Sequence, residues 1–326
     1  MRLLKLVPDD TNIKFLRLRM PFYIFSTLLV VASLALVFTK GLNLGVDFVG
    51  GQQIQVTFVE SEEAPVEELR ERVSSLGYGE PIIQRFGEDN QVTIRFRLPE
   101  EVASDAAASD AMTSQVTNTI TNNFEDARID DLSAVSGKVS GELFSTAMYA
   151  LAIAMIAIAI YIWIRFEWQF GVGALLALVH DVCLTLGMFA LFQLEFDLKI
   201  IAAILTIIGY SLNDTIVVYD RIRENLKKYR KMPIVELLDL SVNETLARTV
   251  MTSLTLIVVL IALLVLGPAS LFGFTAAITL GIVVGTYSSV YMAAPILVWL
   301  GVTSDSFVPA ESPAERQDRI ARGETP

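Results

Sequence analysis

The chain has 326 residues, of which 53% are hydrophobic, and its mean hydropathy is +0.53. A composition this apolar excludes an ordinary soluble domain and indicates an integral membrane protein. The formal net charge is −11, and the presence of a single cysteine, Cys183, excludes a disulfide framework within the chain.

Six apolar runs are long enough to cross a bilayer, which takes about 20 helical residues at a rise of about 1.5 Å each. They cover residues 21–38, 144–164, 170–192, 198–219, 249–266 and 272–300. The first run exceeds the apolar core of a signal peptide and no small-x-small cleavage site follows it, so we expect an uncleaved anchor. The sequence therefore predicts an α-helical integral membrane protein with six transmembrane helices.

The spans divide the chain into an N-terminal segment, a first span, a large loop, a bundle of five spans and a tail. The expected bounds are residues 1–20, 21–39, 40–142, 143–301 and 302–326, with a link inside the bundle at 220–247. Lys and Arg are concentrated in the N-terminal segment and in this link, which predicts that both are cytoplasmic. The C-terminal tail then returns to the cytoplasm, and its mixed charge predicts disorder. The large loop is expected to be periplasmic.

The large loop has 19 acidic and 8 basic residues, a difference equal to the whole net charge of −11. A solvated acidic face is the favoured interpretation, and a specific site for a cation or a basic partner is the alternative.

The loop also has the signals of a small folded domain. Ile54, Val56 and Phe58 alternate with polar neighbours, which predicts a half-buried strand. The expected elements are a strand at 53–60, a helix at 63–76, strands at 81–86 and 91–98, a helix from Ser104 or Asp105 to 124, and a strand at 127–135. The order βαββαβ predicts an α+β domain of the ferredoxin-like kind between the first and second spans.

Asp214 is the most informative residue, because it lies well inside an apolar run that is long enough to span. A carboxylate in hydrocarbon costs about 2.5–3.5 kcal/mol on insertion scales, so an intramembrane acid is a candidate functional residue by default. Loss of water favours the neutral form of a carboxylate, which suits a group that binds and releases protons. The alternative is an acid that only pins this span to a neighbouring helix.

Arg248 begins the fifth span from the cytoplasmic side, and we expect it to pair with Asp214 in the cytoplasmic half of the membrane. Thr252, one turn further on, shares the face of Arg248 and is expected to hydrogen-bond either group. The alternative for Arg248 is a positively charged anchor at the membrane interface.

Other polar residues inside the spans are secondary candidates for a polar path. They are His180 and Asp181 in the third span, and Tyr210, Ser211 and Asn213 in the fourth. A polar packing contact is the alternative for the His180–Asp181 pair. Gly281, Gly285 and Ser289 repeat at four-residue spacing in the sixth span, which favours close helix packing.

Four motifs follow one another along the chain. They are GLNLGVDFVGG at residues 41–51, GYSLNDTIVVYDRIREN at 209–225, NETLART at 243–249 and GIVVGTYSSVY at 281–291. In this order they closely resemble the SecF proteins of the SecD/SecF family, which belongs to the resistance–nodulation–division superfamily. Residue 49 is often Thr in that pattern and is Val here.

The resemblance implies a subunit of the bacterial Sec protein-export machinery in the inner membrane. It implies pairing with SecD, association with the SecYEG channel and YajC, and use of the proton motive force to promote late-stage translocation or release of secreted polypeptides. It also implies a proton-carrying role for Asp214. It marks Asp47, Phe48, Gly50 and Gly51 as a family signature, which we interpret as a hinge that orients the outer domain.

Membrane lipids are expected partners, and nucleic acid is not. No phosphate-binding loop, metal-ligand cluster or nucleophile constellation is present in the sequence, so we expect a protein that is not an enzyme and that has no cofactor and no metal. Two other functions stay open. One is half of a proton-coupled exporter of small molecules, and the other is a scaffold subunit that transports nothing.

Overall fold

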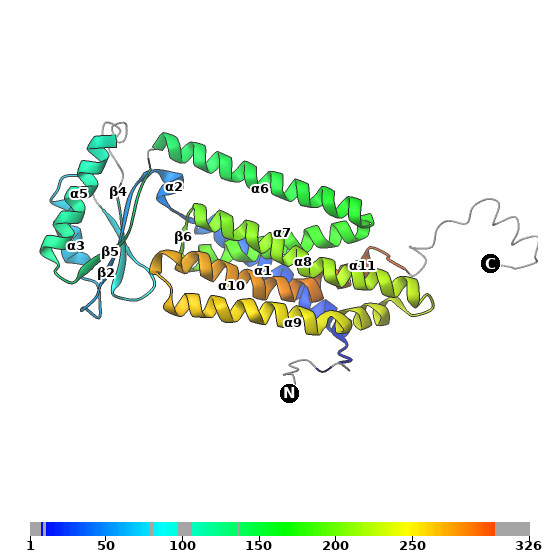
Figure 1. The fold of residues 1–326 in the computed structure, drawn as a ribbon. Helices are drawn as coiled ribbons and strands as arrows, with labels where there is room; N and C mark the ends of the chain where they lie inside the picture. Colours follow the sequence, from blue (N-terminus) through cyan, green and yellow to red (C-terminus); the bar gives the residue numbers. More distant parts are fainter. Residues whose placement is uncertain (1–7, 9–10, 79–80, 97–105, 136, 304–326) are drawn as a thin grey trace, which may run out of the picture.

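The computed structural model describes residues 8, 11–78, 81–96, 106–135 and 137–303. Within this part of the chain, six helices long and apolar enough to span a membrane run side by side, and a small α/β domain stands at one end of them (Figure 1). We call the helices the membrane bundle (residues 15–39 and 137–303) and the α/β domain the sheet domain (residues 43–135). The predicted six-span fold class is confirmed.

The bundle is built from one helix before the sheet domain and the rest after it. These are α1 (Arg19–Thr39), α6 (Gly137–Arg165), α7 (Trp168–Phe192), α8 (Leu198–Lys228), α9 (Ile234–Leu266), α10 (Phe272–Ser288) and α11 (Ala294–Trp299), with the short 3-10 helices η1 (Phe15–Leu18) and η2 (Ala269–Leu271). Helices α8 and α9 have 31 and 33 residues, which is longer than the roughly 30 Å of bilayer hydrocarbon requires. The predicted link at 220–247 is therefore made mostly of helical extensions of these two spans.

The sixth span is interrupted by a π-helical turn. Helix α10 passes into five π-helical residues, η3 (Ser289–Ala293), before α11 begins. Pro295 stands at the start of α11, where a missing N–H is tolerated. Single π-helical turns inside α-helices often occur at functional sites, and this one begins with a buried serine, Ser289.

The sheet domain has the predicted βαββαβ order. Its elements are β2 (Gly51–Phe58), α3 (Val66–Ser74), β3 (Ile82–Arg85), β4 (Gln91–Phe96), α5 (Ala106–Asn123) and β5 (Ala127–Val135). The strands pair antiparallel in the order β3-β4-β2-β5, which is the ferredoxin-like arrangement. Apolar side chains of the sheet, α3 and α5 form its core, including Ile54, Phe58 and Met112. The predicted cap at Ser104 or Asp105 lies outside the described residues.

The prediction that β2 is half-buried is wrong, because all eight of its residues are buried. Strand β2 lies in the middle of the sheet between β4 and β5, so its apolar side faces the domain core. Its polar side is covered as well, and Gln53 there donates to Glu195 of the loop between α7 and α8. The outer face of the sheet is thus in contact with the membrane bundle.

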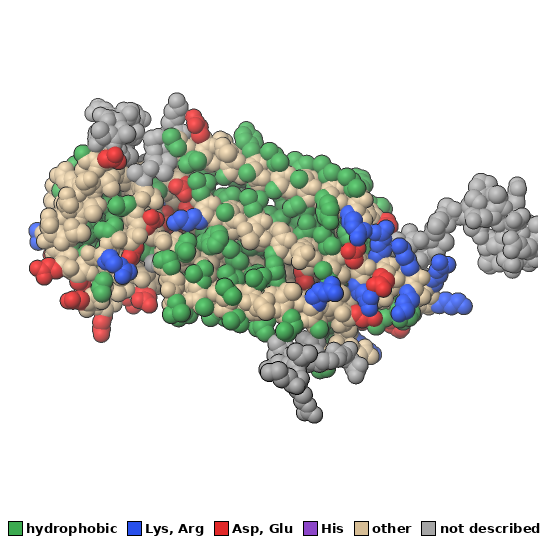
Figure 2. All heavy atoms as spheres, viewed as in Figure 1, with side chains coloured by type: hydrophobic (Ala, Val, Ile, Leu, Met, Phe, Trp, Pro, Cys, Tyr) green, Lys and Arg blue, Asp and Glu red, His purple; other side chains and the backbone are tan. Residues whose placement is uncertain are grey.

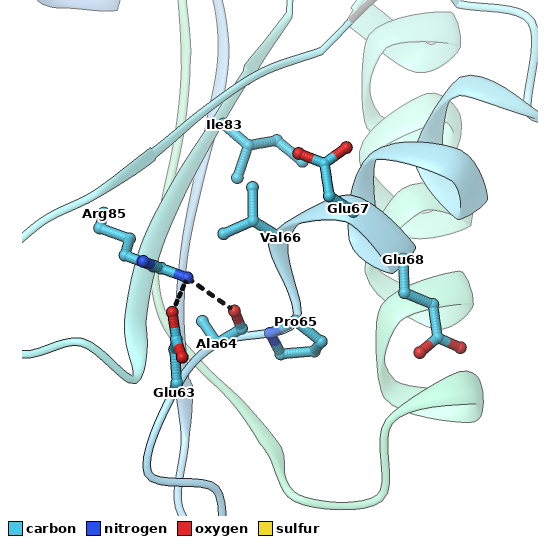
Figure 3. Close-up of a pocket in the computed structure, with 8 residues that line it drawn as sticks. All are labelled: Glu63, Ala64, Pro65, Val66, Glu67, Glu68, Ile83 and Arg85. Atoms are coloured by element: carbon cyan, nitrogen blue, oxygen red, sulfur yellow. Dashed lines mark hydrogen bonds and ion pairs between the residues drawn. The ribbon is translucent and has the colours of Figure 1, made fainter.

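An open pocket of about 640 Å³ lies in the sheet domain beside the start of α3 (Figure 3). Arg85 of the edge strand β3 reaches across it, bonding the Glu63 carboxylate at 2.5 Å and the carbonyl of Ala64 at 3.5 Å. These bonds tie the segment before α3 to the edge of the sheet. Glu67 and Glu68 line the same pocket and belong to the first turn of α3.

The surface of the bundle is divided by chemistry (Figure 2). Large apolar side chains are exposed along its sides, among them Ile153 and Ile156 of α6 and Val258 and Val259 of α9. Lys and Arg gather at the end remote from the sheet domain (Figure 2). Because lipid tails solvate apolar side chains as well as a protein interior does, an apolar belt of this kind fits a membrane-embedded surface.

Candidate functional site

Asp214 lies inside the bundle where three helices meet, and its side chain is buried. Helix α8 carries it, and two hydroxyl groups of neighbouring helices donate to it. Thr249 of α9 donates to Oδ1 at 2.7 Å, and Ser289 of the π-helical turn donates to Oδ2 at 2.6 Å. The carboxylate therefore has one hydroxyl partner on each oxygen.

Asp181 is a second buried carboxylate, on α7, and it is 1% exposed. Its Oδ2 accepts hydrogen bonds from Ser211 of α8 at 2.5 Å and from Ser288 of α10 at 2.8 Å. Its Oδ1 lies 2.9 Å from Nδ1 of His180. The Nε2 atom of His180 is buried and has no hydrogen-bond partner among the described residues.

The two carboxylates belong to one cluster of polar side chains. Ser288 and Ser289 are consecutive in the chain, and the first donates to Asp181 while the second donates to Asp214. On α8, Ser211 and Asp214 are three residues apart and therefore lie on adjoining parts of the helix surface. We call this group the carboxylate cluster, and it consists of His180, Asp181, Ser211, Asp214, Thr249, Ser288 and Ser289.

A chain of hydroxyl groups lies beside the carboxylate cluster. The hydroxyl of Tyr210 is 3.0 Å from that of Ser253, which in turn is 2.7 Å from that of Thr286. A separate pair, Tyr287 and Ser26, joins α10 to α1 at 2.7 Å. Of the predicted secondary candidates, His180, Asp181, Tyr210 and Ser211 thus take part in hydrogen bonds between spans or within the cluster.

Among the described residues, Arg248 and Asp214 do not form the expected ion pair. The side chain of Arg248 has no hydrogen bond or ion pair with any of these residues. Arg248 is exposed, whereas Thr249, the next residue, is buried and faces Asp214. Successive residues of an α-helix differ in direction by about 100°, so both cannot point at one carboxylate. Thr252 is exposed too, and its hydroxyl bonds the carbonyls of Arg248 and Thr249 in its own helix.

Arg248 and Asn213 belong to a polar strip on the outside of the bundle. Asp214 and Thr249 face one another across two antiparallel helices. The residues that precede them, Asn213 and Arg248, therefore both point toward the same side of this helix pair. Exposed small and polar residues continue in both directions at helical spacing. The strip consists of Thr206, Gly209 and Asn213 of α8 and of Arg248, Thr252 and Thr255 of α9.

Small residues allow the helices around the cluster to approach closely, as the four-residue spacing in the sixth span predicts. A Cβ atom at Gly281 would come 2.3 Å from the side chain of Ile207 on α8. A Cβ atom at Gly285 would come 3.1 Å from Cβ of Ser211. Backbones this close bring the serines of α10 and η3 within reach of both carboxylates.

The signature residues lie at the junction between the bundle and the sheet domain. Val46–Val49 form a short helix, α2, in which Phe48 packs into the core of the membrane bundle. Gly50 and Gly51 follow with φ angles of 73° and 124°, conformations that L side chains rarely adopt. Asp47 accepts a hydrogen bond from the backbone N–H of Leu198, the first residue of α8.

Sequence reasoning missed the direct partners of Asp214. The NETLART motif gives Thr249 no role of its own, and the four-residue spacing of small residues in the sixth span accounts for Ser289 by packing alone. The available signal was weak, because a hydroxyl residue in a membrane helix can also bond a carbonyl of the preceding turn. Ser289 does both, since it also bonds the carbonyl of Thr286.

Two family models match the chain. Residues 115–303 match the model described as "Protein export membrane protein SecD/SecF, C-terminal", and residues 35–62 match the "SecD/SecF GG Motif". The second match contains the signature residues at the junction.

Curated relatives and a solved structure extend these matches. A protein translocase subunit SecF of Cereibacter sphaeroides is 43% identical over 307 residues, which covers 92% of this chain and 93% of the relative. The SecF of Rhodobacter capsulatus is 42% identical over 308 residues, covering 92% of each. The crystal structure of SecDF from Thermus thermophilus superposes with a TM-score of 0.79 at 35% identity. The match covers 89% of this chain but 39% of the SecDF chain.

Proposed function

The chain belongs to the SecF family of protein-export membrane proteins, and we propose that it couples proton movement through Asp214 to polypeptide export. Membership places it in the inner membrane as a multi-pass subunit of the Sec protein-export machinery with a SecD partner. The observation that carries the proposal is the buried carboxylate of Asp214, held by hydroxyl groups of two other helices.

Hydroxyl partners suit a carboxylate that changes its protonation state. A hydroxyl group can donate to a carboxylate and can accept from a carboxylic acid, whereas Arg and Lys can only donate. Thr249 and Ser289 can therefore remain bonded to Asp214 whether it is charged or neutral. An Arg partner in their place would favour the charged form alone.

The second carboxylate supplies a continuation of the proton path. Asp181 also has two serine partners, and Ser288 and Ser289 connect the surroundings of the two carboxylates. His180 contacts Asp181, and an imidazole has two ring nitrogens that can bind or release a proton. In our proposal Asp214 is the principal carrier, and Asp181 with His180 forms the adjoining site.

The exposed polar strip supports a helix-to-helix interface with SecD. An Arg at the centre of a membrane helix costs about 2.5–3.5 kcal/mol on insertion scales unless it finds a partner. Arg248 points out of this chain beside Asn213 and Thr252, so we propose that spans of SecD cover the strip and offer a carboxylate to Arg248. Arg248 then acts on the proton path across the subunit interface and not through direct contact with Asp214.

The distribution of charge supports the proposed orientation. Lys and Arg collect at the bundle end remote from the sheet domain, where Arg221, Arg223 and Arg165 form ion pairs with acidic partners (Figure 2). By the positive-inside rule, this distribution of Lys and Arg supports a cytoplasmic location for this end. We therefore propose cytoplasmic termini and a periplasmic sheet domain, in a complex that acts with SecYEG and YajC on secreted polypeptides at a late stage of translocation.

The decisive experiment replaces Asp214 by Asn, which keeps the size of the side chain and cannot carry a proton. We expect Asp214→Asn to remove the stimulation of preprotein translocation by the proton motive force in membrane vesicles that contain SecYEG and SecD. The matched control is Asp220→Asn, on the same helix in a half-exposed position. Co-purification with SecD should be the same for both variants.

Three outcomes would overturn the proposal. Unchanged proton-dependent translocation in Asp214→Asn would remove the proton role, and loss of SecD binding in that variant would favour a scaffold subunit. Proton-dependent efflux of small molecules in vesicles without a secretory protein would favour the exporter alternative.

A further inference from the structure

The segment between α1 and β2, residues 40–50, leads into the sheet domain, and we call it the stem. The stem is paired with the loop between α7 and α8. Strand β1 (Asn43–Leu44) runs parallel to β6 (Glu195–Phe196), and the N–H of Gly45 donates to the carbonyl of Phe196 at 2.9 Å. The paired segments are about 150 residues apart in the chain. A parallel ladder therefore fastens the entrance of the sheet domain to the start of the helix that carries Asp214.

The start of α8 is capped by two carboxylates. The first N–H groups of a helix have no partner within the helix and need one outside it. Asp197 accepts from the N–H of Ile200 at 3.1 Å, which is an ordinary local cap. Asp47 of the signature accepts from the N–H of Leu198 at 3.0 Å. One of the two caps of α8 therefore comes from the stem of the sheet domain.

The strands of the sheet domain add contacts to the same loop. Gln53 of β2 donates to Glu195 at 2.9 Å. Arg95 of β4 donates to the carbonyl of Leu44 at 3.1 Å and to the side chain of Asn43 at 2.9 Å. A Cβ atom at Gly45 would come 2.9 Å from a carboxylate oxygen of Glu195 and 3.2 Å from Cβ of Asp197, so glycine here permits both side chains to approach the ladder closely.

Phe48 fixes the other side of the junction. Its ring packs against Phe196 and Phe144, with centroids 6.0 and 5.5 Å away, inside the apolar core of the membrane bundle. An open pocket of about 500 Å³ lies next to the ladder residues Asn43 and Glu195, between the β3–β4 hairpin, the end of α7 and the start of α10. The domain is thus held at the stem, while the space next to the stem is open.

From this geometry we propose that the signature residues Asp47 and Phe48 belong to a clasp that makes the sheet domain move together with α8. The clasp consists of Asn43, Gly45, Asp47, Phe48, Gln53, Arg95, Glu195 and Phe196. It replaces the hinge expected from the glycines, because Asp47 and Phe48 hold the bundle while Gly50 and Gly51 turn the chain into β2. The inference rests on the proposed proton role of Asp214 and adds the route by which its state reaches the sheet domain.

Helix α8 is suited to transmit a displacement. Asp214 lies 16 residues beyond Leu198, about 24 Å along one continuous helix with no proline in that stretch. A shift or rotation of α8 when Asp214 gains or loses its proton moves the N-terminus of the helix. Asp47 and the β1–β6 ladder pass that movement to β2. Asp47 is a positioning residue in this scheme and takes no proton from Asp214.

The test measures the response of the sheet domain to the state of Asp214. Cys183 is replaced by Ser, and spin labels are placed at Asp110→Cys of α5 and Leu266→Cys of α9, both of which are exposed. Distances between the labels are measured in the complex with SecD, with Asp214 present and with Asp214→Asn as a permanently neutral stand-in. We expect the two distance distributions to differ.

The clasp predicts that Asp47→Ala abolishes this difference and lowers proton-dependent export several-fold, with SecD binding retained. Asp47→Asn keeps an oxygen that can accept from Leu198 and should restore both responses. The control is Asp126→Ala, a carboxylate whose partner, Ser61, lies within the sheet domain. If Asp47→Ala lowers the amount of folded protein, Gln53→Met provides the second variant, because it removes the bond to Glu195 and leaves the cap of α8 intact.

A label response in the clasp variants equal to that of the unaltered protein would overturn the inference. An absence of any response in the unaltered protein would overturn it as well. Failure of the proposed function looks different, because Asp214→Asn would then leave proton-dependent export intact whatever the labels show.

Discussion

The sheet domain and the membrane bundle bury different kinds of side chain at their centres. The sheet domain has an apolar core in which Val56, Phe58, Ile94 and Ile120 are at most 1% exposed. The bundle also contains apolar clusters, but α7, α8, α9 and the α10–η3 segment enclose a group of hydroxyls, one imidazole and two carboxylates.

The difference follows from the surroundings of each region. The sheet domain stands in water and gains its stability by removing apolar surface from it. The bundle stands in hydrocarbon, where apolar side chains gain nothing by turning inward, so close packing and hydrogen bonds hold the helices together. The interior of the bundle can therefore contain the polar groups to which we assign the proton role, and apolar side chains can cover its outside.

The largest expected effect breaks the apolar core. Phe58 is 0% exposed and its ring packs edge-on against Phe124. Phe58→Ala should lower the free energy of unfolding of the sheet domain by about 3–5 kcal/mol, the usual cost of removing a buried aromatic ring. Urea unfolding followed by hydrogen exchange in β2 and β4 measures it. A cost under about 1 kcal/mol would show that apolar packing does not hold this domain.

A second change crowds the bundle. A Cβ atom at Gly187 of α7 would come 2.1 Å from the hydroxyl and 2.9 Å from Cα of Ser33 on α1. Gly187→Ala should therefore destabilise the bundle by about 1–3 kcal/mol, the typical cost of overpacking. The control is Gly171→Ala on the same helix, where the nearest atom is 3.8 Å away. That variant should be neutral or stabilise by up to about 1 kcal/mol. Equal melting temperatures for both would contradict the close approach.

A third change separates stability from function inside the carboxylate cluster. Ser288→Ala and Ser289→Ala each remove one hydrogen bond to a buried carboxylate, which should cost about 1 kcal/mol of stability. Proton-dependent export should fall much more than this cost implies, because the connection between Asp181 and Asp214 is interrupted. Thr279→Ala is the control, since the one hydrogen bond of that hydroxyl among the described residues goes to the carbonyl of Thr275 in its own helix. Export that falls equally in all three variants would contradict a path through the serines.

The smallest expected effect concerns the contact between the two regions. Burial raises the pKa of the Glu195 carboxyl above its usual range, and nearby Asp197 adds to the rise. Arg95, Lys199 and the hydrogen bond from Gln53 oppose it. A raised pKa in the folded state means that the contribution of Glu195 to stability is complete below its ordinary pKa and is lost as the pH rises through the folded-state value.

Glu195→Gln removes this titration and still offers an oxygen to Gln53. We expect the variant to raise the melting temperature near pH 7.5 by a few degrees at most and to have less effect at pH 5. Melting curves in detergent at the two pH values measure it. A stabilisation that is larger at pH 5 than at pH 7.5 would show that the carboxylate is held in its charged form.

Much of the architecture could be read from local patterns. A span needs about 20 apolar residues, so run lengths identify the six helices without any knowledge of their packing. Period-two alternation identifies the strands of the sheet domain, and β5 begins at Ala127 and ends at Val135 as predicted. The burial of the polar face of β2 could not be predicted, because a strand whose polar face is covered shows the same alternation as a half-buried strand.

The sequence by itself determined that Asp214 is a special residue, because a carboxylate in a membrane span is costly wherever the helix packs. Only the tertiary structure decided which groups meet it. Helix rotation turned Arg248 outward and Thr249 inward, and helix packing brought two neighbouring serines to two carboxylates on different spans. The pairing of Asp47 with the start of α8 was equally hidden, because it joins segments about 150 residues apart and no periodicity records such a contact.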